Sequence, residues 1–301
     1  MSTKRRALTG VLLLDKPAGL SSTSALGRAK WIFQAEKAGH TGTLDPFATG
    51  LLPICFGEAA KFARFMLDAD KGYRATLRLG ETTPTGDTES EPDERREVNV
   101  DTEKVRSVLK KFFGAQTQIP PMHSALKQDG VPLYKLARKG IEVNREARAI
   151  TVESLEFVSL NDNVLIIDTR VSKGTYIRVL AKDIGEALGC GAHLTALRRT
   201  STGGFALAEA LTLEQLEALT PDHRDAILRA PDALCPGLPA IVLDAASSKS
   251  FGHGQVITGR PDVAGEFRIY ADSGRFLGIG VISGSGQGAA TLTAVRLMSG
   301  G

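Results

Sequence analysis

A polar loop that carries a single aspartate is the part of this sequence best suited to chemistry. Residues 39–50 read GHTGTLDPFATG, with three glycines, three threonines, His40 and Asp45. Because proline disfavours helical dihedral angles in the residue before it, Asp45 is expected to be held extended. A carboxylate fixed in this way suits a nucleophile or a base, since a preset geometry removes the entropy of finding the reactive orientation. Taken alone, an Asp-Pro pair is more typical of a simple turn.

Sequence motifs of several other enzyme classes are absent. There is no GxxxxGK[ST] phosphate loop, no GxGxxG after a strand, no GxSxG elbow and no HExxH pair. The GHTG run has the GxxG shape of an RNA-clamping loop, but it lacks the helices that flank that loop. We therefore expect neither a cofactor nor a metal, which leaves hydrolysis, group transfer or isomerisation without redox chemistry.

Charge is distributed unevenly along the 301 residues, although the formal net charge is only +3. Residues 81–103 contain nine acidic and two basic side chains, a local charge of −7, so the remainder carries +10. A basic remainder leaves room for a face that binds a polyanion such as nucleic acid. Acidic runs are also commonly solvated loops, so charge alone does not decide this.

Cysteine usage and hydropathy predict a cytoplasmic protein. Cys55, Cys190 and Cys235 are far apart and form no CxxC pair, which argues against a disulfide framework and a zinc knuckle. The basic, apolar start resembles a signal peptide but lacks a small-residue cleavage site, so it is better interpreted as a buried strand. No run of about 18 apolar residues is present to span a membrane.

The elements around the loop alternate between strands and helices. We expect a strand at 10–15, a helix capped by Ser21 or Ser22 that runs to residue 33, a strand at 51–56 and helical spacing at 58–67. A half-buried strand at 73–79 precedes an acidic loop or poorly ordered excursion at 80–101. An amphipathic helix is expected at 104–113, with one apolar face formed by Val105, Val108, Leu109, Phe112 and Phe113.

The second half of the chain predicts a basic flap, a return to the sheet and a separate β domain. Residues 119–148 are proline-rich and carry six basic against three acidic residues, as a substrate-gripping flap or a solvated surface helix would. Paired strands at 150–158 and 164–171, a helix at 175–188 and a strand at 194–200 follow. After prolines that mark a linker, short strands at 267–270, 276–282 and 292–297 are expected, with SGSGQG at 283–288 as a hairpin loop.

These residues join a pattern that resembles the TruB family of pseudouridine synthases over essentially the whole chain. The resemblance is carried by six ordered blocks: GVLLLDKPAGLSSTSAL, GHTGTLDPFATGLLPICFGEAAKF, KGYRATLRLGETTPTGD, IPPMHSALKQDGVPLYKLARKG, VSKGTYIRVLAKDIGEALG and AHLTALRRTSTGGF. It implies an α/β (α+β) fold with a mixed, mainly antiparallel sheet. Residues 1–235 would form the catalytic domain, with the flap as an RNA-gripping insertion, and residues 240–301 a PUA-like RNA-binding domain.

The resemblance also implies the reaction. A uridine at position 55 in the T-loop of tRNA would be isomerised to pseudouridine: the N1–C1′ bond breaks, the base turns, and C5 bonds to C1′. No electrons move, and the family uses neither cofactor nor metal, in agreement with the missing motifs. Whether the carboxylate attacks C6, attacks C1′ or removes the 2′ hydrogen stays open at this point.

Residue roles are carried over by position. Asp45 stands at the family's catalytic aspartate and Arg178 at the arginine that pairs with it, which would lower the pKa of the carboxyl group. The positions matched to the target base and its surroundings are Tyr73 (stacking), Tyr176 (a second aromatic), Leu197 (an apolar wall), His40 (the flipped base), Lys16 (support of the loop) and Asp87 (contact with RNA).

The flap aligns with the insertion that holds RNA in the family. Lys127, Lys135, Arg138 and Lys139 are candidate phosphate contacts, which would make binding weaken with salt. His123 departs from the family pattern, since an aromatic residue, usually tyrosine, is expected before SAL. A protonatable ring there could make contact with tRNA sensitive to pH.

Two alternatives remain beside a stand-alone tRNA-modifying enzyme. One is a guide-RNA-dependent relative that acts on ribosomal RNA; the flap and the compact C-terminus favour the stand-alone type. The other is an RNA-binding or RNA-folding protein whose catalysis is incidental. We expect a monomer with tRNA as its partner, no membrane and no obligate protein partner, because no heptad or apolar helix face is left over.

Overall fold

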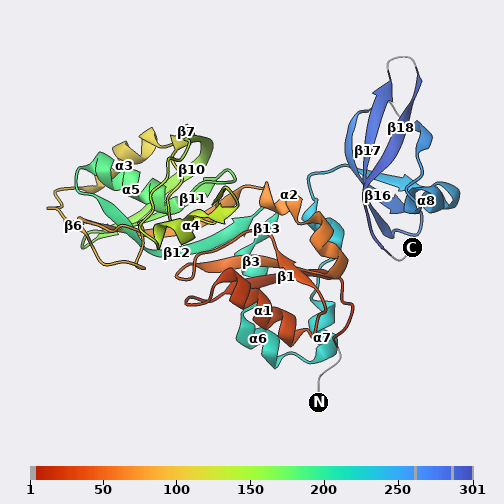
Figure 1. Cartoon of the computed structure of the whole chain (residues 1–301), viewed down its shortest axis with the longest axis horizontal. Coiled ribbons are helices and arrows are strands. Elements are labelled where there is room, and N and C mark those ends of the chain that lie inside the picture. Colours follow the sequence, from red (N-terminus) through yellow and green to blue (C-terminus); the bar gives the residue numbers. More distant parts are fainter. Residues whose placement is uncertain (1–4, 261–262, 286–287, 300–301) are drawn as a thin grey trace.

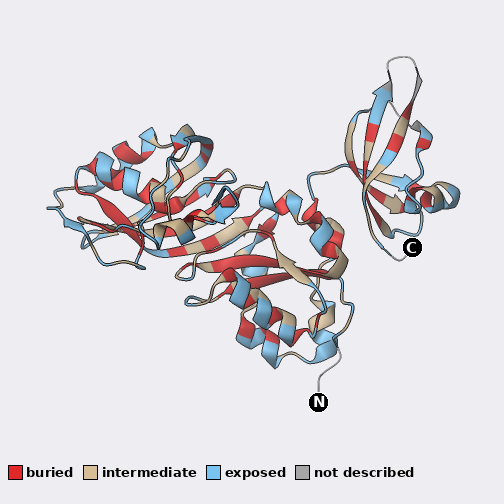
Figure 2. Ribbon diagram, in the orientation of Figure 1, coloured by how far each residue is buried: buried red, intermediate tan, exposed pale blue. Residues whose placement is uncertain are grey.

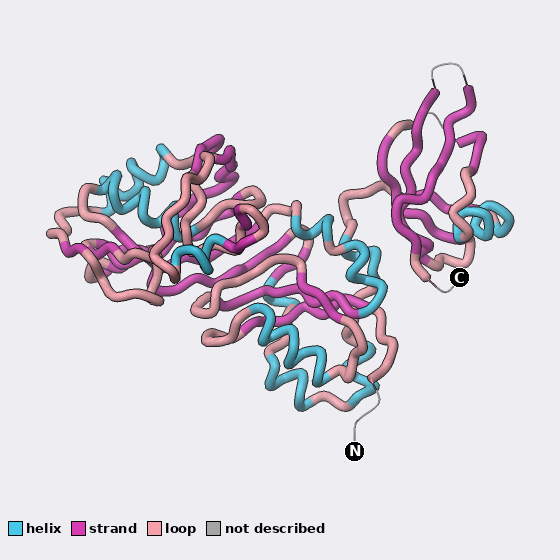
Figure 3. Tube along the Cα trace, viewed as in Figure 1, coloured by secondary structure: helices cyan, strands magenta, loops and turns pink. Residues whose placement is uncertain are grey.

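The computed structural model of the chain describes residues 5–260, 263–285 and 288–299. These residues form two large β-sheets with helices packed around them, and two small two-stranded ribbons. A nine-stranded sheet forms the main body, and a five-stranded sheet lies at one end of the molecule (Figure 1). The tube in Figure 3 shows the two groups of strands with helices beside each of them. This is the expected α+β fold. No helix of the described residues is both long and apolar enough to cross a membrane.

The nine-stranded sheet is mixed and mainly antiparallel, in the order β1-β3-β12-β4-β11-β10-β7, with β2 paired to β3 and β13 to β12. Its strands are β1 (Gly10–Lys16), β2 (Ala38–His40), β3 (Thr49–Phe56), β4 (Lys71–Leu79), β7 (Gly114–Gln118), β10 (Arg148–Asn161), β11 (Val164–Val171), β12 (Ala192–Thr202) and β13 (Phe205–Ala206). Only β3 and β12 run parallel. Strand β12 therefore joins an N-terminal half, which carries the polar loop, to the central hairpins.

The helices pack on the main sheet or lie in the segments that connect its strands (Figure 1). The α-helices are α1 (Ser22–Ile32), α2 (Arg64–Leu67), α3 (Thr102–Lys111), α4 (Leu133–Ala137), α5 (Ile177–Leu188), α6 (Leu213–Ala218), α7 (Pro221–Ala226) and α8 (Ala245–Gly252), and the 3-10 helices are η1 (Gly57–Phe62), η2 (Leu207–Glu209) and η3 (Pro231–Leu234). Helix α5 contacts β12 and α3, and α1 contacts β3 and α6. The helical spacing expected at 58–67 corresponds to two short helices, η1 and α2.

Strand β1 is apolar on both faces because both faces are buried. Leu12 and Leu14 point into the large core cluster under α1 and α5, while Val11 and Leu13 point into a second cluster against η1 and η3. A strand with two buried faces has a continuous apolar sequence in place of an alternating one. Figure 2 shows these N-terminal strands as an almost unbroken band of buried residues.

The C-terminal sheet has the order β14-β16-β17-β18-β15. Its strands are β14 (Ala240–Leu243), β15 (Ile257–Arg260), β16 (Gly265–Ala271), β17 (Phe276–Ser285) and β18 (Gly288–Leu297). Strands β17 and β18 form the expected hairpin; two residues of its predicted loop, 286 and 287, lie outside the described residues. The sheet docks on the main body through the Phe62 and Phe276 rings, 5.2 Å apart, and an ion pair of 2.6 Å between Arg64 and Glu266.

The acidic excursion differs from an extended solvated loop. It contains a two-stranded ribbon of β5 (Glu81–Thr82) and β6 (Glu94–Arg95), and Thr82, Thr83 and Asp87 in it are buried. Arg96 joins the excursion to α5 through an ion pair of 2.7 Å with Glu186. The charge count alone did not predict these buried positions, at which the segment packs back against the main sheet.

Candidate active site

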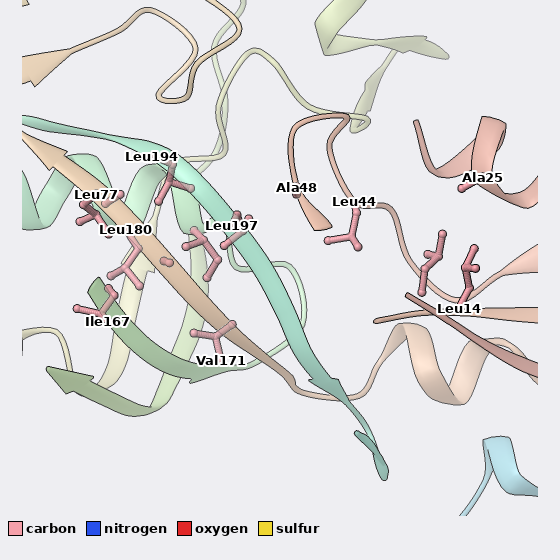
Figure 4. Packing of buried hydrophobic residues seen from close by; sticks show 14 of the residues in the cluster. Leu14, Ala25, Leu44, Ala48, Leu77, Ile167, Val171, Leu180, Leu194 and Leu197 are labelled. Carbon is pink, nitrogen blue, oxygen red and sulfur yellow. The ribbon is translucent and has the colours of Figure 1, made fainter. Parts of the chain in front are cut away.

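The loop that carries Asp45 is fastened to helix α1 at one residue before the aspartate. The Ser22 hydroxyl accepts a hydrogen bond from Leu44 N at 2.7 Å and donates one to Leu44 O at 2.9 Å, and Ser22 is buried. Ser21 is the N-cap of α1 and Ser22 is its first residue, so the first turn of the helix lies against the loop. Figure 4 shows Leu44 and Ala48 on the loop between Ala25 of α1 and Leu197 of β12; all four belong to the large core cluster.

On the other side of the aspartate, the loop is fastened by the KPAG segment. Lys16 is fully buried, and its Nζ donates to the carbonyl oxygens of Pro17 and Leu20 at 2.8 and 2.6 Å and reaches Pro46 O at 3.4 Å. Gly19 N also donates to Pro46 O at 2.8 Å. Burial lowers the pKa of Lys16 to about 8, while the negative charge of Asp45 opposes that change. Lys16 therefore supports the loop and does not line the pocket.

Helix α5 begins at the site and presents Arg178 in its first turn. Tyr176 is the N-cap residue, and the Gln118 side chain takes the role of a capping group: its Oε1 accepts from Tyr176 N at 2.8 Å and its Nε2 donates to Tyr176 O at 3.1 Å. Unfilled backbone groups at a helix start need such partners. Gln118 thus fixes the direction in which Tyr176 and Arg178 leave the backbone.

Arg178 contacts three segments of the site. Its Nε lies 3.1 Å from Asp45 Oδ2, and its Nη1 lies 3.5 Å from Asp87 Oδ2. Nη1 also donates to Thr85 O at 3.1 Å, and Nη2 donates to His123 O at 2.7 Å. One guanidinium therefore connects the polar loop, the acidic excursion and the base of the flap.

The pKa of Asp45 is raised above its ordinary value, because burial disfavours its charged form more than its neighbours favour it. The Arg178 charge and the more distant Lys16 charge lower this pKa, whereas Asp87 raises it. The sequence predicted a lowered pKa from Arg178 alone. That contribution is present, but the partial burial of the carboxyl group outweighs it.

A pocket opens directly above this carboxyl group. It has a volume of about 360 Å³, and Asp45, Tyr73, Tyr176, Arg178 and Leu197 all line it. These five side chains come from the polar loop, β4, the start of α5 and β12, so the pocket lies where the central strands meet the loop. Leu197 is buried and Tyr73 is half-buried. Burial raises the pKa of Tyr176, so its hydroxyl stays protonated at neutral pH.

Two other predicted site residues lie outside this lining. His40 ends strand β2, and its Nδ1 accepts from Gly42 N at 3.4 Å; burial lowers the pKa of its imidazole, which keeps that nitrogen free to accept. Asp87 is only 1% exposed and faces Arg178. The expected contact between Asp87 and RNA does not fit this burial, because a ligand at the surface cannot reach the carboxylate.

The flap spans residues 119–148 and closes one side of the pocket. It contains a small ribbon, β8 (Lys127–Gln128) with β9 (Val131–Pro132), followed by α4, and its Ser124, Ala125 and Leu126 line the pocket. The candidate phosphate contacts lie beyond these residues: Lys127, Lys135, Arg138 and Lys139 are all exposed. Among the described residues, none of these four takes part in an ion pair. Burial, together with the charge of Arg178, lowers the pKa of His123.

Sequence reasoning missed three residues at the site: Gln118, which caps α5, and Lys71 and Arg199, which line the pocket. The Lys71 Nζ donates to Met66 O, Leu67 O and Ala69 O. The available signal for Arg199 was its place two residues after Leu197, which on a strand puts both side chains on one face. Among the described residues, no group of three or more His, Cys, Asp and Glu could hold a metal ion.

Three family models match successive segments of the chain. Residues 30–177 match the TruB family pseudouridylate synthase N-terminal domain. Residues 178–234 match the tRNA pseudouridylate synthase B C-terminal domain, and residues 239–297 match the domain described as pseudouridine synthase II TruB, C-terminal. The first boundary falls between Tyr176 and Arg178, so the site is shared by two of the matched segments.

Curated relatives and a solved structure give the same result. A protein named tRNA pseudouridine synthase B from Burkholderia mallei is 54% identical over 282 residues, covering 91% of this chain and 93% of the relative. One of the same name from Chromobacterium violaceum is 49% identical over 300 residues, covering 99% and 97%. A chain in the crystal structure of a Cbf5-Nop10-Gar1 complex superposes with a TM-score of 0.74 at 25% identity, over 97% of this chain and 86% of that one. The resemblance inferred from the six motifs is confirmed, and this chain belongs to the TruB family of pseudouridylate synthases.

Proposed function

We propose that this protein isomerises a uridine in tRNA to pseudouridine, at position 55 of the T-loop, and that Asp45 carries out the reaction. The family and the names of relatives at about half identity support uridine isomerisation in tRNA. The observation that carries the role of Asp45 is its place at the wall of the pocket, with its Oδ2 3.1 Å from Arg178 Nε.

The reaction rearranges one nucleotide without oxidation or reduction. The N1–C1′ bond of uridine breaks, the detached uracil turns within the pocket, and a C5–C1′ bond forms. The proton on C5 is lost and N1 gains one, so substrate and product are isomers. Asp45 is placed to act on the ribose or the base in its ionised form, and the half-buried Tyr73 is a candidate to take part in removal of the C5 proton.

A uridine inside a folded RNA loop must leave its stack to reach this pocket. Aromatic side chains offset part of the stacking energy that is lost when a base turns out. Tyr73 and Tyr176 supply such rings, and Leu197 supplies an apolar wall. In this proposal Tyr73 stacks on the base, and His40, which bonds to the loop backbone behind the lining, lies beside the space that the base vacates.

Arg178 and Asp87 act together in this proposal. Arg178 fixes the orientation of Asp45, and Asp87 fixes Arg178 from the opposite side. A charged group held by two partners in a partly dry site keeps its geometry through the reaction, which is the condition for electrostatic preorganisation. Asp87 then contributes through Arg178, and not by contact with RNA.

Binding of the rest of the tRNA falls to two surfaces. The exposed flap residues Lys127, Lys135 and Lys139, with Arg138, would contact backbone phosphates. We assign residues 1–235 to catalysis and 240–301 to an RNA-binding unit, on the basis of the separate C-terminal sheet and its separate family match. A monomer that acts on the T-arm without a protein partner would suffice.

Activity on an unmodified tRNA transcript tests the proposal. The purified protein alone is expected to convert the T-loop uridine of such a transcript, and a transcript with cytidine at that position is the matched control. Conversion that requires an added guide RNA, or none at all with intact tRNA binding, would refute the assignment. The second result would favour an RNA-folding role.

A further inference from the structure

Arg199 is a buried arginine at the pocket whose positive charge no carboxylate balances. It lies on β12 in register with Gly50 of β3 on one side and Tyr73 of β4 on the other, and it is 1% exposed. Among the described residues no acidic side chain lies within ion-pair distance of its guanidinium. Buried charges in proteins are normally paired, because removal from water is costly. The fold therefore retains an unpaired buried charge whose cost a neutral side chain would avoid.

Arg199 bonds to one end of the loop that carries Asp45 and lies close to the other. Its Nε donates to Leu51 O at 2.6 Å, just after the loop returns to the sheet. Its Nη1 lies under the start of the loop, 3.7 Å from the place that a Cβ on Gly42 would occupy. Asp45 lies between Gly42 and Leu51 in the sequence, so the guanidinium is near both segments that lead to it.

The strands approach so closely here that the arginine has little freedom to move. A Cβ on Gly50 would come within 2.3 Å of Arg199 O, and Gly50 has a φ of 103°. Only glycine adopts that conformation readily, and only glycine leaves room for the neighbouring backbone. The parallel pairing of β3 with β12 therefore fixes the base of the Arg199 side chain against the loop.

The surroundings of the guanidinium are cationic. Burial lowers the pKa of His40, Lys16 and Lys71, and the charge of Arg199 lowers each of them further. Nη2 is buried and has no hydrogen-bond partner in the protein. Lys16 and Lys71, in contrast, each donate to backbone carbonyl groups. Arg199 is thus held by one hydrogen bond and by packing, and it contributes charge and shape beneath the loop.

We propose that Arg199 is a positioning residue for catalysis: from its buried place beside Gly42, its hydrogen bond to Leu51 O fixes the loop, and hence Asp45. This inference rests on the proposed role of Asp45. Its consequence is specific. Loss of the guanidinium slows the chemical step on bound RNA, whereas RNA affinity and overall stability stay close to those of the native protein.

The test compares Arg199→Met with Arg74→Met in single-turnover assays on tRNA, with separate measurements of RNA affinity and of urea unfolding. Arg74 follows Tyr73 on β4 but is exposed and pairs with Asp168, so its loss leaves the loop untouched. For Arg199→Met we expect the rate on bound RNA to fall on the order of 100-fold, the effect typical of a misplaced reactive group. Affinity is expected to stay near native, because Arg199 is only 1% exposed and presents almost no surface to RNA. The urea midpoint stays near the native value, since relief of an unpaired buried charge offsets the hydrogen bond lost to Leu51.

Three outcomes would overturn the proposal. A native rate for Arg199→Met removes the role, a loss confined to RNA affinity makes Arg199 an RNA-binding residue, and a loss of stability with a native rate per folded molecule makes it structural only. If Arg199→Met does not fold, Arg199→Lys decides: lysine lacks the Nε–H that donates to Leu51 O, so a reduced rate is expected and a native rate contradicts the proposal. Asp45→Asn is measured in parallel, because its activity would refute the proposed function, whereas its inactivity beside a native Arg199→Met rate would refute only this inference.

Discussion

Arg178 holds two carboxylates that enter the site from different segments, with Nε 3.1 Å from Asp45 and Nη1 3.5 Å from Asp87. The Arg178 and Asp87 side chains are 6% and 1% exposed, whereas that of Asp45 is 37% exposed toward the pocket. The carboxylate that is open to a ligand is therefore the one at the predicted catalytic position. The buried one can act only through the arginine.

Asp87→Asn should slow the reaction and also shift its pH dependence. The change removes a buried charge partner of Arg178, which is worth roughly 1–3 kcal/mol, or on the order of 10- to 100-fold in rate if it is expressed at the transition state. Asp87 raises the pKa of Asp45, so its neutralisation lowers that pKa. If ionised Asp45 is the active form, activity is lost as pH falls through this pKa, and the acid limb of the variant's profile should move to lower pH.

The measurement is a single-turnover rate profile against pH for the native protein and for Asp87→Asn. Glu91→Gln is the control, since Glu91 lies exposed in the same acidic excursion and outside the pocket lining. A profile for Asp87→Asn that moves to higher pH would contradict the electrostatic account, even if the rate fell as expected.

Removal of the flap charges should weaken tRNA binding in a way that depends on salt. Replacing Lys127, Lys135 and Lys139 by alanine deletes three exposed amines, and each lost phosphate contact makes the slope of log affinity against log salt shallower by about one. The rate on fully bound tRNA should stay near native, because these side chains lie outside the pocket lining. Binding titrations at several salt concentrations measure both quantities. An unchanged slope would mean that RNA phosphates bind elsewhere on the protein. The control variant is Lys110→Ala, in α3 and outside the flap.

Gly50→Ala should destabilise the fold where β3 meets β12. The added Cβ would lie 2.3 Å from Arg199 O, at a residue with a φ of 103°. The backbone conformation alone costs roughly 1–3 kcal/mol for a residue other than glycine, and relief of the clash must separate the strands. Urea unfolding measures the change. Gly237→Ala is the matched control, since nothing lies within 4 Å of its added Cβ; equal stability of the two variants would show that the strands tolerate separation.

Local signals predicted the elements that build the site. The Ser21 cap, the 3.6-residue periodicity of 177–188 and the apolar strand before the KPAG segment are all features of short stretches, and the structure has α1, α5 and β1 there. The motif resemblance brought together Asp45, Tyr73, Tyr176, Arg178 and Leu197, which line one pocket. Their roles in catalysis remain the predictions tested above.

Residues that act through long-range contacts escaped prediction. Gln118 caps a helix that begins far along the chain from it. The motif resemblance named Asp87 as a site residue, but its burial against Arg178 was not predicted. The raised pKa of Asp45 has the same origin: burial is a property of the folded surroundings, whereas the opposing charge of Arg178 could be inferred from a motif. The spacing from Leu197 could place Arg199 on the pocket face of its strand, but not its contacts, because these lie on another strand and a loop.

The most direct test of the central claim is tritium release from an unmodified tRNA transcript labelled with [5-³H]uridine, compared between the native protein and Asp45→Asn. Formation of the C5–C1′ bond expels the label from C5, so the native protein should release the tritium of the one target uridine. Asp45→Asn, which keeps the size of the side chain but loses its charge, should bind the same tRNA and release none. Equal release by both proteins would show that Asp45 is only a turn residue, and would contradict the account of this site.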